Sequence, residues 1–208
     1  MSDLFAVYKL SNDGLTLLME QVLAGDTLHV SKAHAFLATG RSQLESDLPA
    51  WRESLRWETE TERRYDEAKQ SRDEAAQEFR GSVRPARQWV IGAFPRGDKR
   101  PGEYGLDTLP PKSIGKMLAR GRFLLQANTQ EPPLEPTLPE RLLAPIQQAF
   151  VQLEARVTEF QSAVANRKQA RAARKTLRKE MEQRLRQLRQ HLYTYFDPDD
   201  PILADYGL

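Results

Sequence analysis

The residues of this chain that are best able to do chemistry are the lysines and arginines between positions 167 and 189. This stretch holds ten basic and two acidic residues, for a net charge of +8. Cations at this density can neutralise the phosphates of a nucleic acid or another anionic surface. The side chains occupy several faces of a helix, however, and a nucleic-acid site of this type needs a one-sided stripe. The simpler interpretation is a solvated face that is partly paired with acidic residues of the same chain.

An acidic stretch lies between Glu45 and Glu78, with eleven acidic and six basic residues and a net charge of −5. Trp57 in this stretch is two residues beyond Leu55, an apolar-stripe position, so its ring should point elsewhere. It is the best candidate for an exposed aromatic that binds a partner. The candidate interaction surface therefore consists of Trp57, Lys168, Arg171, Arg174, Lys175, Arg178, Lys179 and Arg186.

No other group of side chains has a spacing that predicts catalysis, a metal site or a bound cofactor. His29 and His34 are five residues apart, which suits one helix face poorly, and His191 is isolated. Prolines interrupt the aspartates of 197–200, so an acidic turn fits better than a calcium loop. Glu58, Glu60 and Glu62 fan around a helix instead of converging, and the chain has no cysteine. The sequence predicts no catalytic residue, cofactor, metal ligand or small-molecule substrate.

The elements that position these residues follow from an internal repeat. When the sequence is shifted by 102 positions, its second half falls on its first half without a gap. Such a match predicts a duplicated unit of about one hundred residues. The identical positions include Arg72 and Arg174, Glu78 and Glu180, Arg87 and Arg189, Phe94 and Phe196, Tyr104 and Tyr206, and Gly105 and Gly207.

Apolar residues at helical spacing predict a short helix and a long amphipathic helix in each unit. No glycine or proline marks a turn near 58–66 or 160–168, so continuous long helices are favoured, although a hairpin at either place stays open. Residues 1–12 are read as a short strand or an extended arm. The predicted helices are 14–24, 31–45, a long acidic helix over about 46–94, 112–127, and a long basic helix over about 138–196.

These elements predict an all-α fold, an elongated helical bundle or coiled coil built from two duplicated units. The units are 1–107 and 108–208, and they are expected to share one core. The acidic and basic long helices would be complementary across their contact. Since a surface ion pair adds only about 0–1 kcal/mol, the charges would mainly set register and partner choice. Homodimerisation through the same surfaces is an alternative.

The C-terminal run RLRQLRQHLYTYFDPDDPILADYGL resembles the end of an uncharacterised class of bacterial helical-bundle proteins. In that class a basic helix with regularly spaced leucines is followed by an acidic Pro/Asp turn and an aromatic-Gly-Leu anchor. The resemblance covers 163–208 and, more weakly, 68–106. It implies an all-helical fold and carries no activity or functional residue.

The N-terminal residues lack a basic region followed by an apolar one, so no signal peptide is predicted. No apolar run approaches the roughly 20 residues of a membrane-spanning helix. A cytoplasmic location is expected, and export by a route without a cleaved signal stays open.

The preferred function is a non-enzymatic structural or protein-interaction role, with a protein partner or a second copy bound through the charged faces. The alternative is binding of nucleic acid or an anionic surface through the basic helix 167–189.

Overall fold

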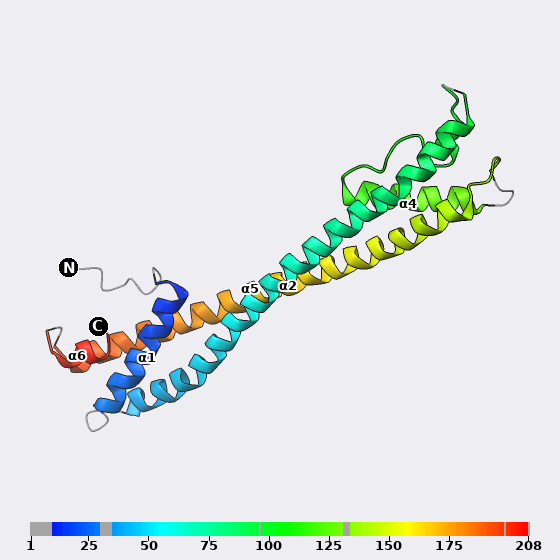
Figure 1. The fold of residues 1–208 in the computed structure, drawn as a ribbon. Coiled ribbons are helices and arrows are strands. Elements are labelled where there is room, and N and C mark those ends of the chain that lie inside the picture. The colour runs from blue at the N-terminus through cyan, green and yellow to red at the C-terminus, as the bar shows by residue number, and fades with distance from the viewer. Residues whose placement is uncertain (1–9, 30–34, 96, 131–133, 198, 208) are drawn as a thin grey trace. The chain divides into compact units, whose positions relative to one another are not determined.

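A computed structural model of the chain describes residues 10–29, 35–95, 97–130, 134–197 and 199–207 (Figure 1). Within these residues the ordered elements are helices and there is no strand, so the all-α prediction is confirmed. Of the short strand or extended arm expected over 1–12, residues 1–9 lie outside the described residues, and α1 begins at Asn12. The helices are α1 (Asn12–Leu28), α2 (Ala35–Ala93), α3 (Arg100–Glu103), α4 (Ile114–Thr129), α5 (Glu140–Tyr195) and α6 (Ile202–Asp205).

Helix α1 is longer at both ends than the predicted 14–24. Its N-cap is Ser11, whose Oγ accepts a hydrogen bond from the N–H of Gly14 at 3.0 Å. Gly25, expected to end the helix, lies inside it. A Cβ atom at this position would lie 2.7 Å from the carbonyl oxygen of Asp205. Glycine is therefore needed here for the close approach of α6, because only glycine lacks that atom.

The two long helices are continuous through 58–66 and 160–168, as favoured from the sequence. A separate helix over 31–45 is not observed, because α2 continues through Pro49 to Ala93. Proline inside a helix costs one backbone hydrogen bond. Here Leu48 and Trp51, on either side of the proline, are both buried, and this packing offsets the cost.

Two compact units divide the described chain differently from the predicted halves 1–107 and 108–208. Unit 1 contains 1–62 with 166–208, and unit 2 contains 63–165. Each unit thus takes one part of each long helix. Each has its own core, whereas a single shared core was expected. Sequence periodicity shows which face of a long helix is apolar, but it does not show which part of the partner helix covers that face.

The core of unit 1 is formed by α1, α6 and one part of each long helix. Trp51 has no exposed surface, and its indole N–H donates a hydrogen bond to Thr16 Oγ1 at 2.9 Å. This bond joins α2 to α1, and α1 also packs against α6 (Figure 1). The buried apolar residues are Leu15, Leu18, Met19, Val22, Leu44, Leu48, Trp51, Met181, Leu185, Leu188, Leu192, Leu203 and Tyr206.

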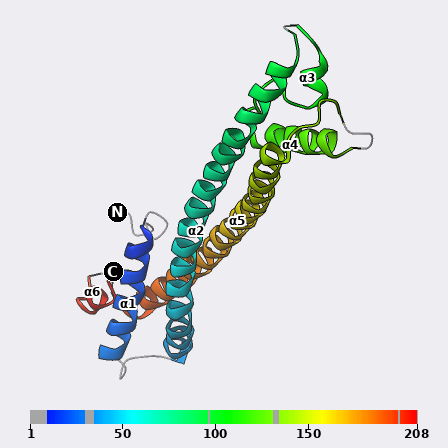
Figure 2. The same cartoon turned by 45° about the vertical axis from the view of Figure 1, so that its right-hand side comes forward.

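In unit 2, α4 lies beside the first part of α5 (Figure 2). Arg122 of α4 and Glu154 of α5 form an ion pair at 2.8 Å. The Phe79 and Phe150 rings, whose centroids are 5.5 Å apart, meet beneath Gly121. The core also contains Val83, Ala86, Val90, Tyr104, Leu106, Met117, Leu124, Leu143, Ile146 and Leu153.

The elements of the two units correspond at the same offset of 102 positions as the sequence match. Helix α1 begins at Asn12 and α4 at Ile114, α3 and α6 are each four residues long, and α2 and α5 end at Ala93 and Tyr195. The glycines that follow α3 and α6 both have a positive φ, +68° at Gly105 and +72° at Gly207. The two folds are therefore built alike, and descent from a gene duplication stays a prediction.

Asp26 of unit 1 corresponds to Asn128 of unit 2, and the two differ in the hydrogen bonds that they make, although each leaves its Oδ1 without a partner. The Asn128 amide donates to the carbonyl oxygens of Tyr104 at 3.0 Å and Leu124 at 2.7 Å. Asp26 is 4% exposed and its Oδ2 receives one bond, from Arg41 at 3.4 Å. Burial raises the pKa of Asp26 above its ordinary value of 3.8, with the Arg41 charge partly opposing the rise. The ionised side chain is thus unfavourable in the folded state.

We expect Asp26→Asn to increase the free energy of unfolding at pH 7 by about 1 kcal/mol, because the new amide could donate as Asn128 does. The pKa of Asp26 is raised in the folded state, so ionised Asp26 destabilises the fold fully above that pKa. The destabilisation is lost as the pH falls toward 3.8. The gain should therefore shrink between pH 7 and pH 4 in urea unfolding experiments. The reverse change, Asn128→Asp, should destabilise by about 1–3 kcal/mol. A destabilised Asp26→Asn variant at pH 7 would contradict this account.

Candidate interaction surface

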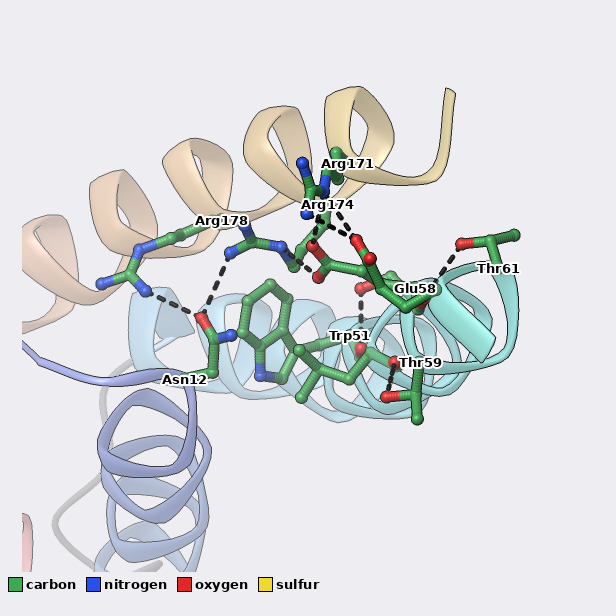
Figure 3. A network of polar contacts seen from close by, with 11 residues as sticks. Asn12, Trp51, Glu58, Thr59, Thr61, Arg171, Arg174 and Arg178 are labelled. Atoms are coloured by element: carbon green, nitrogen blue, oxygen red, sulfur yellow. Dashed lines mark hydrogen bonds and ion pairs between the residues drawn. The ribbon is translucent and has the colours of Figure 1, made fainter. Parts of the chain in front are cut away.

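The basic stretch of α5 lies in unit 1, beside the first part of α2, and most of its cations fall into two sets. Figure 3 shows the first set, the arginines that point toward α2. Arg174 Nε lies 2.5 Å from Glu58 Oε2, and Arg171 lies 2.6 Å from Glu62. Arg167 also reaches Glu62, at 2.7 Å. The hydrogen bond from Arg167 is the main reason why the pKa of Glu62 is lowered, so this carboxylate is ionised at neutral pH.

The second part of this network ties the start of α1 to α5. Arg178 donates to Asn12 Oδ1 at 2.9 Å (Figure 3). It also donates to the carbonyl oxygen of Leu10 at 2.5 Å. It also pairs with Glu182 four residues ahead, at 2.7 Å. Arg184 pairs with Asp47 of α2. Arg171, Arg174 and Arg178, three of the eight residues of the predicted surface, are therefore engaged in contacts inside unit 1.

The second set of cations is a row of three exposed lysines, Lys168, Lys175 and Lys179. We call these three residues the lysine face. They are seven and four residues apart, so at 100° per residue they lie within about 20° of one line along the helix, and the row is about 17 Å long. None of the three has an ion-pair or hydrogen-bond partner among the residues that the structure describes. Arg186 continues the line, and its guanidinium lies 4.0 Å from Glu182.

The basic residues occupy several faces of the helix, as expected from the sequence, and the structure sorts them by partner. Once the arginines that pair with Glu58 and Glu62 are set aside, the remaining lysines form a one-sided row. The expectation that Glu58, Glu60 and Glu62 fan around the helix missed the signal for this, because Glu58 and Glu62 are four residues apart and so share a helix face.

Trp57 is 36% exposed, as predicted, and lies on α2 in unit 1. No hydrogen bond or ring contact joins its indole to any residue in the described part of the chain. Within the described residues no hydrogen bond or ring contact joins Trp57 to the lysine face, so the two are treated as separate features of unit 1.

The remaining candidates for chemistry have structural roles. His29 Nε2 lies 2.8 Å from Asp205, and its ring stacks on Tyr206 with centroids 6.0 Å apart, which joins α1 to α6. The Asp200 side chain accepts a hydrogen bond from the N–H of Ile202, the first residue of α6. His34 lies outside the described residues. Across the residues that are described, no group of three or more acidic or histidine side chains could hold a metal ion.

Comparison with protein-family models, with curated proteins and with solved structures found no match to this chain. The resemblance of the C-terminal tail to bacterial helical-bundle proteins therefore stays a prediction. No helix in the described ranges has both the length and the apolar character needed to cross a membrane.

Proposed function

We propose that this chain is a non-enzymatic helical interaction protein and that the lysine face of unit 1 binds an acidic partner protein. The observation that supports this most is the division of the basic stretch. Arg171, Arg174 and Arg178 are held in contacts that stabilise unit 1. Lys168, Lys175 and Lys179 are exposed and without an ion-pair partner among the described residues. No ion pair of the described fold uses their charges, which are therefore available to a partner.

The spacing of the lysine face fits an acidic helix of a partner protein, and its one-sided row also meets the condition set above for a nucleic-acid site. Its three cations lie in one straight row on a helix, with rises of about 10.5 Å and 6 Å. Carboxylates at the same spacing on a partner helix would match this row. Charged faces of this kind set the association rate and the choice of partner more than the affinity.

A titration with fluorescent poly-L-glutamate at low salt tests this proposal. Wild-type protein should bind, and Lys168→Gln/Lys175→Gln/Lys179→Gln should bind at least tenfold more weakly. The matched control is Lys99→Gln/Lys112→Gln/Lys116→Gln, which removes three exposed charges from unit 2. It should bind like the wild type. Equal losses in the two variants, or no binding by the wild type, would contradict the proposal.

Nucleic acid is the second candidate, because the same three lysines could neutralise phosphates. With three contacts, the slope of log K against log salt for duplex DNA would be roughly −2.7. A filter-binding experiment decides between the two. If DNA binds more tightly than poly-L-glutamate and its binding needs the lysine face, the second candidate replaces the first.

A further inference from the structure

The part of α2 in unit 2 carries a row of exposed carboxylates, Glu67, Glu74 and Glu78. These residues are seven and four positions apart, so they too share one helix face. Glu67 pairs with Arg63 at 2.5 Å and keeps 60% of its side chain exposed. Glu74 accepts a hydrogen bond from Gln70 at 2.8 Å, and Glu78 has no ion-pair or hydrogen-bond partner among the described residues. We call these three residues the glutamate face.

The glutamate face and the lysine face have opposite charge and the same spacing in the same chain direction. Two helices that lie parallel in register would place Glu67 opposite Lys168, Glu74 opposite Lys175 and Glu78 opposite Lys179. If the two helices were antiparallel, the seven-residue spacing of one row would lie opposite the four-residue spacing of the other. The two middle charges would then not face each other. The match therefore specifies both a register and a direction.

We propose that the acidic partner of the lysine face is the glutamate face of a second copy of this chain, with the two helices parallel. This inference rests on the proposed function and identifies the partner. The occupant follows from charge complementarity and from the shared spacing. Exposed ion pairs are weak individually, so the association is reversible and sensitive to salt.

Two charge-reversed chains test the pairing. One carries Lys168→Glu/Lys175→Glu/Lys179→Glu, and the other carries Glu67→Lys/Glu74→Lys/Glu78→Lys. Each has two faces of one sign, so each alone should be monomeric by light scattering at low salt, where the wild type is expected to associate. An equimolar mixture should recover the mass of the wild-type assembly. Circular dichroism shows whether each reversed chain folds.

A second measurement stays close to the wild type in case a reversed chain fails to fold. The chain has no cysteine, so single cysteines can be placed between the charges. Ser71→Cys and Ala172→Cys lie opposite each other in the parallel register, and facing Cα atoms within about 7 Å can form a disulfide. A mixture of these two variants should form a covalent dimer. A mixture of Ser71→Cys and Thr176→Cys, in which the two cysteines are one helical turn out of register, should form much less covalent dimer.

Each outcome decides the inference. Recovery of association in the mixture, or selective cross-linking of the in-register pair, supports it. A wild type that is monomeric at low salt, or reversed chains that associate alone, overturns it. If the wild type is monomeric but still binds poly-L-glutamate through the lysine face, the proposed function stands and the partner is a different protein. If poly-L-glutamate is not bound either, both fail.

Discussion

Trp51→Ala should lower the free energy of unfolding by about 3–5 kcal/mol, as expected when a large aromatic is removed from a packed core. Trp51 has no exposed surface and lies in the core of unit 1. Its loss would leave a cavity between α1 and α2 and remove the hydrogen bond to Thr16. Urea unfolding followed by circular dichroism measures the change.

Trp57→Ala is the matched control, because it removes the same atoms from the same helix where the ring is 36% exposed. This variant should lose no more than about 1 kcal/mol, since most surface substitutions have small effects. Equal destabilisation by the two substitutions would show that the packing assigned to Trp51 is wrong.

Gly121→Met is expected to destabilise unit 2 by about 3 kcal/mol, at the upper end of the usual cost of overpacking a core. A Cβ atom at Gly121 would lie 2.5 Å from Phe150 Cδ2 and 3.0 Å from Phe79 Cζ. The rings are fixed in the core, so they could not move away without strain. Thermal unfolding of the variant should show a clearly lower midpoint.

The equivalent positions in unit 1 hold Met19 and Leu48, where unit 2 has Gly121 and Phe150. Met19 and Leu48 belong to the core of unit 1, and in unit 2 Gly121 lies against the ring of Phe150. Gly121→Met/Phe150→Leu should therefore recover more than half of the loss caused by Gly121→Met alone. A double variant that is no more stable than the single one would show that the two cores are not interchangeable at these positions.

Much of the fold could be predicted from the sequence because the apolar spacing is regular and occurs twice. Phe79, Val83 and Val90 share an offset with Met181, Leu185 and Leu192, and all six are buried. The sequence could not show which segment packs against the apolar stripe of each long helix. The path of α2 through Pro49 and the division of each long helix between two cores depend on packing between segments more than one hundred residues apart.

The candidate site was predictable in composition and not in arrangement. The high density of basic residues in 167–189 identified the region, and Trp57 was correctly expected to be exposed. Whether a given cation is free depends on the acidic residue that it faces. Arg171 and Lys175 look alike in the sequence, but only Arg171 lies within reach of Glu62.

The central claim is that the basic stretch divides into arginines that hold the fold and lysines that bind the partner. The direct test is a poly-L-glutamate titration of two matched triple variants, each assayed well below its unfolding temperature. Lys168→Gln/Lys175→Gln/Lys179→Gln should bind at least tenfold more weakly than the wild type, and Arg171→Gln/Arg174→Gln/Arg178→Gln should stay within about threefold. A larger loss in the folded arginine variant than in the lysine variant would contradict the claim.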